Sequence, residues 1–288
     1  MENLRITAKG IKREARGLLA NNWSRALGGL CIYLMVLVLF IQVTQLVTAL
    51  LGEYGTGWTS SKKLNGFADY FEFYTSGDMG VNMLIMLALA AFFFLLSAPL
   101  SLGITYWYRK LSLLEGLQVG QIFHFYQSNQ KFIDAVIFQA LHTAFRLGFA
   151  LISFLPSVVC FAFSYGAGKS AEGGSGSTLL LILGIGLAVA GLFVYGALSL
   201  NFFFAKYLYC GEYGYGPMDC LRYSAMYMKR HIGHVLGVIV SFAGWFASCI
   251  FILPLAYVVP FYNASMAACA QDIIDEHMGE TLERLKKR

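Results

Sequence analysis

The chain has 288 residues, of which 58% are hydrophobic and 13% are charged. Soluble domains have about 45 to 50% apolar and about 25% charged residues, so this chain has too little polar surface to coat a water-soluble globule. Its net charge of +5 is modest, and the basic residues lie beside apolar segments, which favours anionic lipid headgroups over nucleic acid as partners. The composition therefore predicts a protein that is solvated by lipid.

Residues 1–25 form a basic segment before the first apolar run. Four apolar residues recur in it every three or four positions: Ile11, Ala15, Leu18 and Leu19. This spacing predicts an amphipathic helix whose apolar face lies on the inner leaflet, and a solvated basic tail is the alternative. Arg13 and Arg16 are its candidate contacts to lipid or to a partner. The apolar run that follows is too long for a cleaved secretory signal, so we expect it to remain as an anchor.

Six segments within a single domain over residues 26–270 are expected to cross the membrane. They lie at about 26–51, 81–103, 147–165, 179–205, 232–252 and 255–270. Cytosolic loops are enriched in Lys and Arg, and the basic loops here fall on alternate sides. The last segment is short for a span, but the charged tail 271–288 returns to the cytosol only if six spans are present. We predict an all-α, polytopic transmembrane helix bundle of about six spans plus interfacial amphipathic helices, with both termini cytosolic and the loop 52–80 outside.

The apolar stretch 132–165 is too long for one straight span. As a helix it would measure about 51 Å, whereas the hydrocarbon core of a bilayer is about 30 Å thick. We expect this stretch to bend or to lie partly flat, with the segment 118–146 packed at the interface or under the bundle.

Two polar stripes are candidates for a polar path through the membrane. Gln139, His142 and Arg146 are spaced three and four residues apart and share one helix face. If that helix is submerged, an Arg and a His at depth mark a substrate or ion path, and the alternative is an interfacial helix that meets phosphates. Gln42 and Gln45 form a second stripe in the first span, where such residues more often hydrogen-bond between helices.

A helix is also expected over 219–230, between the fourth and fifth spans. It would present Arg222, Lys229 and Arg230 as candidate contacts to anionic headgroups or to a partner protein. The alternative is an amphipathic connector that lies on the membrane.

Small residues at a spacing of four predict where helices approach closely. Gly184 with Ala188 and Gly186 with Ala190 lie on the fourth span, and Gly233, Gly237 and Ser241 lie on the fifth. These faces are expected to pack within one protomer, and a homodimer is the alternative.

No segment carries a set of residues that predicts catalysis, a metal or a cofactor. Residues 166–170 mimic the end of a phosphate-binding loop, but Phe163 stands where the pattern needs Gly. His231 and His234 share a helix face without a third ligand. We therefore expect a protein that is not an enzyme and that binds no cofactor or metal.

Three groups of residues carry a resemblance to a known family. They are the block 20–23 before the first span, the block 99–103 at the end of the second, and a C-terminal set of Ser224, Met228, Lys229, His231, Ser241, Phe242, Gly244, Trp245, Pro260 and Phe261. In these positions the chain resembles bacterial integral membrane proteins known as domain of unknown function nine-seven-five. It departs from them at 155–157, where Leu-Pro-Ser replaces the usual Ile-Pro-Gly. The resemblance implies a multi-span protein of the plasma (cell) membrane of Gram-positive-type bacteria, and it supplies no activity.

Three classes of function follow in order of preference. The first is a non-enzymatic protein that binds lipid or a partner and supports envelope assembly, secretion or stress tolerance. The second is a small-molecule or ion transporter or channel with a polar path near His142 and Arg146. A membrane enzyme comes last, because no Ser with a placed base and no His and Glu metal pair is present. The expected partners are a bilayer with anionic headgroups and either another membrane protein or a second copy of this chain.

Overall fold

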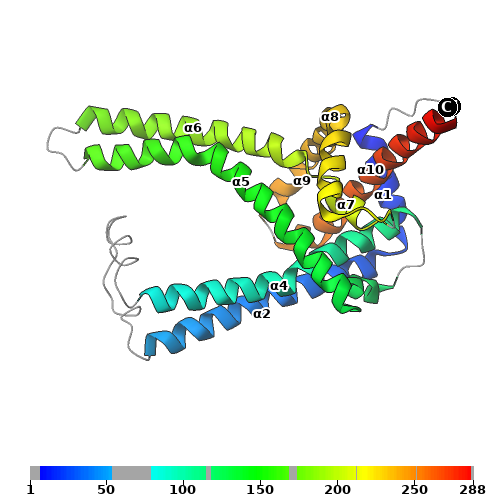
Figure 1. Cartoon of the computed structure of the whole chain (residues 1–288), viewed down its shortest axis with the longest axis horizontal. Helices are drawn as coiled ribbons and strands as arrows, with labels where there is room; N and C mark the ends of the chain where they lie inside the picture. Colours follow the sequence, from blue (N-terminus) through cyan, green and yellow to red (C-terminus); the bar gives the residue numbers. More distant parts are fainter. Residues whose placement is uncertain are drawn as a thin grey trace.

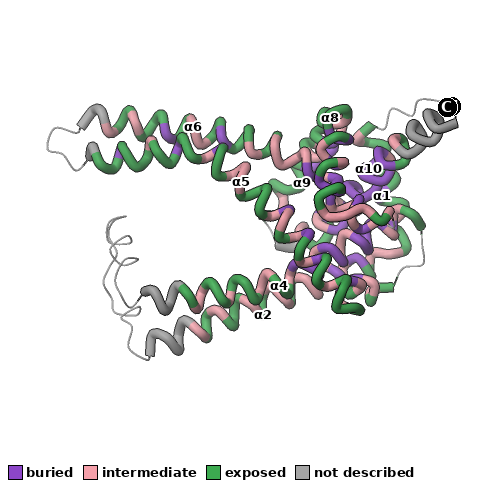
Figure 2. Tube along the Cα trace, viewed as in Figure 1, coloured by how far each residue is buried: buried purple, intermediate pink, exposed green. Residues whose placement is uncertain are grey.

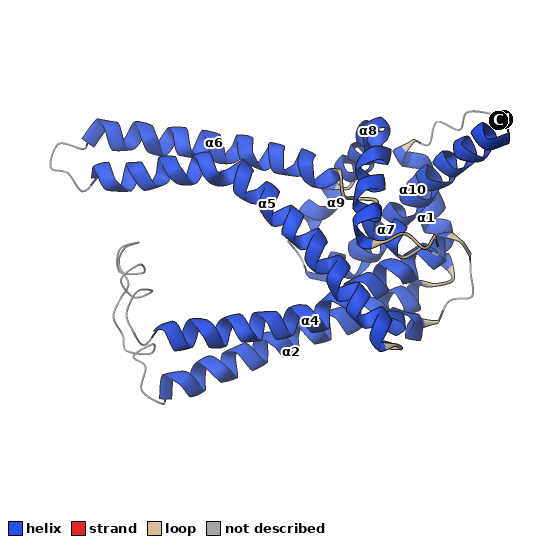
Figure 3. Cartoon of the chain, viewed as in Figure 1, coloured by secondary structure: helices blue, strands red, loops and turns tan. Residues whose placement is uncertain are grey.

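The computed structural model describes residues 7–53, 79–114, 118–168, 174–211, 213–250 and 252–286. The elements within these ranges are α1 (Ala8–Ala20), α2 (Trp23–Glu53), α4 (Met79–Ser112), η1 (Val119–Tyr126), α5 (Asn129–Gly168), α6 (Gly174–Leu200), α7 (Ala205–Tyr209), α8 (Pro217–Ser241), α9 (Ala243–Ser248) and α10 (Ile252–Lys286). All of them are helices (Figures 1 and 3), which confirms the predicted all-α class. The loop expected outside the membrane at 52–80 falls largely outside the described residues.

Five helical stretches are long and apolar enough to cross a membrane. They are Trp23–Val47, Leu84–Ser112, Asn129–Gly166, Ser177–Tyr209 and Pro217–Ser248. Large apolar side chains on them face outward, such as Leu39 with 62% and Phe193 with 75% of its surface exposed. Apolar surface of this extent is covered by lipid, so the chain is a membrane-embedded helical protein. The segment 255–270, expected as a sixth span, lies in α10, which is not one of these stretches.

Two long hairpins extend from a common base (Figure 1). α2 pairs with α4 and α5 pairs with α6, and the free ends of both hairpins lie at the same end of the molecule. We call these hairpins the two arms, and we call the packed region of α1, η1, α7, α8 and α10 the base. Exposed residues dominate the arms, whereas buried residues gather in the base (Figure 2). The N-terminal helix α1 and the C-terminal helix α10 both lie at the base end, and the side of the membrane on which the base lies stays a prediction.

Two glycines allow α5 and α6 to pack closely along their arm. A Cβ on Gly191 would lie 2.5 Å from the carbonyl oxygen of Ser153, and a Cβ on Gly184 would lie 2.8 Å from the Phe161 ring. Small residues at such positions let two helix backbones approach in lipid. The prediction that the Gly184 face packs within one protomer is therefore confirmed. The same prediction for the Gly186 face is wrong, because a Cβ on Gly186 would meet no atom within 4 Å.

The small-residue face of α8 behaves differently. A Cβ on Gly233 or on Gly237 would meet no atom within 4 Å. The prediction that this face packs within the protomer is wrong, because α8 turns its other face, with Val235 and Val238, toward the base.

The helix α5 runs unbroken for 40 residues and bends in its middle (Figure 1). Pro156 lies inside it and has no N–H to donate to the carbonyl four residues earlier, which is a common cause of a bend. The stretch 132–165 therefore bends, as one of the two expected outcomes.

Within the expected segment 118–146, η1 is separate and residues 129–146 belong to α5. Ile122, Phe125 and Phe138 are buried in the core of the base, so this segment packs under the bundle, which is one of its two expected positions.

The apolar face of α1 lies against protein and not against the inner leaflet. Ile11, Ala15 and Leu19 are fully buried, and α1 contacts α8 and α10. An amphipathic helix buries its apolar stripe against the nearest apolar surface, and the base supplies one within the same chain. The expected leaflet-facing stripe is thus corrected.

The structure also corrects the boundaries of the C-terminal elements. The carbonyl of Ser241 ends α8 and accepts a hydrogen bond of 2.7 Å from the Lys12 ammonium, an arrangement that suits the negative end of a helix dipole. Because α8 ends at Ser241 and α9 begins at Ala243, the expected span 232–252 is divided between these two helices. The expected connector 219–230 is the first half of α8. The expected tail 271–288 begins as part of α10, where Ile273 and Ile274 are buried.

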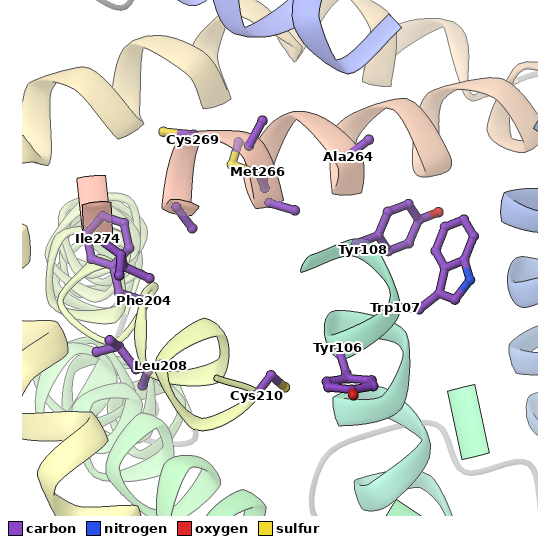
Figure 4. Packing of buried hydrophobic residues seen from close by; sticks show 14 of the residues in the cluster. Tyr106, Trp107, Tyr108, Phe204, Leu208, Cys210, Ala264, Met266, Cys269 and Ile274 are labelled. Atoms are coloured by element: carbon purple, nitrogen blue, oxygen red, sulfur yellow. The ribbon is translucent and has the colours of Figure 1, made fainter. Parts of the chain in front are cut away.

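The core of the base joins three segments that lie far apart in the sequence (Figure 4). Residues of α4, of the α7 region and of α10 meet there, and they include Tyr106, Trp107, Tyr108, Phe204, Leu208, Cys210, Ala264, Met266, Cys269 and Ile274. The buried guanidinium of Arg109 fastens α4 to the loop after α7, because it donates to the Cys210 carbonyl at 3.1 Å and to the Tyr213 hydroxyl at 3.0 Å. This core holds α7 against α4, α8 and α10.

Candidate functional site: a cationic cavity at the foot of the arms

A cavity of about 350 Å³ lies where the α5–α6 arm meets the base. Its polar lining comes from α4, α5, α6, α7 and α10 and includes Thr105, His142, Arg146, Ser199, Lys206, Tyr207 and Asn263. Ligand pockets of proteins range from about 300 to 1,000 Å³, so this cavity has room for a small ligand or a headgroup.

A second cavity of about 240 Å³ adjoins the first on the side of the α2–α4 arm. The two cavities share three lining residues: Thr105, Lys206 and Asn263. The rest of the second lining is more apolar and includes Leu30, Tyr33, Ile104, Tyr108 and Val259. Lys206 therefore stands between a cationic cavity and a mainly apolar one.

The helix α5 supplies two polar groups of the lining, one neutral and one cationic, from one face. His142 is 5% exposed, stacks on Phe138 and hydrogen-bonds to the backbone of Phe202, so its ring is held in place. Arg146, one turn further along, donates to the hydroxyl of Tyr195 on α6 at 3.2 Å. The predicted clustering of His142 and Arg146 is thus seen in the structure, and both line the larger cavity.

Lys206 is the second cationic group of the lining. The linings of both cavities contain no Asp or Glu, and within the described part of the chain the Lys206 ammonium makes no hydrogen bond, although the Lys206 carbonyl accepts one from the Cys210 N–H at 3.0 Å. A charge that is withdrawn from water without a partner costs several kcal/mol. The cavity therefore has an excess of positive charge that an anion can offset.

The sequence alone did not single out Lys206. In the sequence, Lys206 is a basic residue directly after the fourth expected span, 179–205, a position at which lysines commonly extend toward water. In the structure it lines the two cavities, because it lies in α7, which begins one residue earlier at Ala205 and is held by the core of the base. The available signal was the isolation of one lysine within a long aromatic and apolar stretch.

The other three residues of the expected polar path do not line the cavity. Gln139 is half-buried, and its Oε1 has no hydrogen-bond partner among the described residues. Gln42 and Gln45 are exposed on α2. Their exposure on the arm means that they do not continue the path from His142 and Arg146.

The five basic residues that were expected to contact lipid or a partner are all exposed on the base. They are Arg13, Arg16, Arg222, Lys229 and Arg230. They belong to α1 and α8, which contact each other, and the Arg16 guanidinium lies over the Phe261 ring at 5.4 Å. This surface can meet anionic headgroups or an acidic partner.

An acidic cluster lies where α1 meets α10. Burial first, then the charges of Glu14 and Asp275, raise the pKa of Asp272 from 3.8 to about 6. A raised carboxyl pKa means that the folded state binds protons more tightly than the unfolded state, so this contribution to stability is present in acid and is lost as the pH rises through about 6.

No group of three or more His, Cys, Asp or Glu side chains in the described part of the chain lies close enough to hold a metal ion. His231 lies beside His277, with ring centroids 5.2 Å apart, and no third ligand completes this pair among the described residues. All six cysteines are free.

Comparisons with known proteins give no match: no family model, no curated protein and no solved structure is significantly similar to this chain. The resemblance to the bacterial family of unknown function therefore stays a prediction. We infer the function from the residues that line the cavity.

Proposed function

We propose that this membrane protein is a non-enzymatic binding protein that holds an anionic lipid headgroup in the cavity around Lys206. The observation that carries the proposal is the Lys206 ammonium, which lines the cavity beside Arg146 and has no acidic partner among the residues that the structure describes. A bound anion would replace the missing countercharge, and the low dielectric of the interior would strengthen the attraction.

The chemistry of the lining suits a phosphate. A guanidinium donates two parallel hydrogen bonds to phosphate oxygens, and an ammonium adds a compact charge beside it. Tyr207 and Asn263 can donate to the remaining oxygens. Lys206 also lies near the end of the candidate span Ser177–Tyr209, which is the depth at which headgroups are found.

We propose a second role for the exposed basic residues of α1 and α8, which is to contact the membrane surface or a partner protein. They would hold the base against an anionic leaflet, or recruit an acidic partner, while the cavity holds a lipid. A protein of this kind would support envelope assembly, secretion or stress tolerance in the plasma membrane.

The test is native mass spectrometry of the protein in an uncharged detergent with phosphatidylglycerol or phosphatidylcholine. We expect phosphatidylglycerol to be retained, and we expect Lys206→Gln and Arg146→Gln each to weaken its binding about tenfold or more, because a hydrogen bond to a charged group contributes about 1.5 to 3 kcal/mol. Arg25→Gln removes an exposed charge on α2, outside the cavities and outside the basic surface of α1 and α8, and serves as the matched control. Equal binding of both lipids, or an equal loss in the control, would contradict the proposal.

Transport of a small anion is the second candidate, and one observation favours it. The two cavities meet at Lys206, which places a cationic residue between two chambers of a membrane-embedded bundle. Uptake of chloride or phosphate into proteoliposomes, which Lys206→Gln should abolish, tests this candidate. Uptake no faster than into empty liposomes would exclude it for these anions.

A further inference from the structure

We infer that the ligand is an anionic amphiphile whose headgroup fills the larger cavity while its aliphatic chain passes Lys206 into the second one. This inference rests on the proposed function and adds where the apolar part of the ligand lies. It makes the two adjoining cavities one binding site with two chemically different halves.

The two cavities have chemically different linings, which indicates a ligand with two different ends. The larger cavity holds His142 and Arg146, whereas the smaller one has neither and is lined by aliphatic and aromatic side chains such as Leu30, Ile104 and Val259. A free anion would use only the cationic half. A molecule that is charged at one end and apolar at the other matches both halves.

Lys206 lies where the two cavities adjoin. Its side chain contributes to both linings, as do Thr105 and Asn263, so the cavities adjoin at a polar boundary. A lysine combines an apolar stem with a charged end, and a stem of this kind lies well along an aliphatic chain while its ammonium contacts the headgroup. Lys206 would therefore mark the junction of headgroup and chain.

The position of the two cavities in the fold gives a ligand access from the bilayer. Both cavities lie at the foot of the two arms, which diverge from the base and expose apolar residues along their length (Figure 2). Lipid covers those residues, so an amphiphile can reach the site from the bilayer without crossing water. The linings offer no carboxylate for the positive group of a zwitterionic headgroup, which favours a net negative one such as a phosphate monoester.

The experiment compares three probes on the full-length protein in an uncharged detergent: dodecyl phosphate, inorganic phosphate and dodecyl maltoside. Native mass spectrometry measures the retention of each dodecyl probe, and competition measures whether inorganic phosphate displaces dodecyl phosphate. We expect dodecyl phosphate to be retained, dodecyl maltoside to be lost, and inorganic phosphate to compete only in large excess.

Variants of the apolar half separate the chain from the headgroup. Leu30→Phe narrows the second cavity and should weaken dodecyl phosphate about tenfold or more, because each methylene that is excluded costs about fourfold in affinity. Leu39→Phe enlarges an exposed side chain on the same helix and should change nothing. Ser101→Leu narrows the second cavity from α4, so the test does not depend on the folding of a single variant.

The outcomes distinguish this inference from the function on which it rests. If both narrowing variants fold and bind dodecyl phosphate like wild type, or if inorganic phosphate competes at equal concentration, the chain does not lie in the second cavity and headgroup binding still stands. If Lys206→Gln binds dodecyl phosphate like wild type, both proposals fail.

Discussion

Replacement of Gly103 by Ala should destabilise the base, because no space exists for the added methyl group. A Cβ on Gly103 would lie 1.8 Å from the backbone carbonyl oxygen of Ile122 in η1. Ordinary contact begins at 3.4 Å, so α4 and η1 would have to separate by about 1.6 Å. Because the obstacle is backbone, it cannot yield by rotation of a side chain.

The size of the effect follows from two opposing terms. Overpacking of a well-packed interior costs about 1 to 3 kcal/mol, and a carbonyl at this distance points to the upper end of that range. Replacement of a helical Gly by Ala stabilises the helix by up to about 1 kcal/mol, which opposes this loss. We therefore expect a net loss of about 2 kcal/mol, or a decrease in Tm of about 4 to 8 °C for a chain of this size.

Thermal unfolding in detergent, followed as the fraction that remains monodisperse, measures this change. Gly148→Ala is the matched control, because its Cβ would meet no atom within 4 Å and α5 continues through it. The control should be as stable as wild type or slightly more stable. A Gly103→Ala protein with the Tm of the control would refute the close contact between α4 and η1.

Three further predictions concern the arms, the acidic cluster and the topology. Gly191→Leu should separate α5 from α6 and lower the Tm, whereas Gly186→Leu, which points into open space, should not; equal losses would contradict the packing of this arm. Asp272→Asn should raise the Tm at pH 7.5 and leave it unchanged near pH 4, where the carboxyl is protonated in the folded state. A difference in Tm that is the same at both pH values would show that the raised pKa of Asp272 does not affect stability. A cysteine at exposed Arg222 should resist an impermeant thiol reagent in whole cells and react after permeabilisation, and labelling of intact cells would place the base outside; Ser224 is fully buried and cannot serve as this reporter.

Features that depend on local periodicity were predictable from the sequence. The shared face of His142 and Arg146 follows from a spacing of four residues in a helix, and the helix class follows from long apolar runs. The bend in α5 follows from an excess of length over the bilayer. Each of these inferences needs only residues that are close in the chain.

Features that depend on distant segments were not predictable. The stripe of α1 that includes Ile11 and Ala15 has the same pattern whether it lies on a leaflet or on α10, and only the fold decides between them. Gly184 and Gly233 look alike in sequence, yet one faces a neighbouring helix and the other faces open space. Lys206 became a site residue only when α4, α5 and α10 were seen to surround it.

The most direct measurement of the central claim is anomalous diffraction from crystals soaked with selenate, a phosphate-sized anion that can be located by its selenium. We predict a strong peak in the larger cavity, within hydrogen-bonding distance of Lys206 and Arg146, and the loss of this peak in crystals of Lys206→Gln. Peaks confined to exposed basic residues such as Arg13 and Arg222, with none in the cavity, would contradict this prediction.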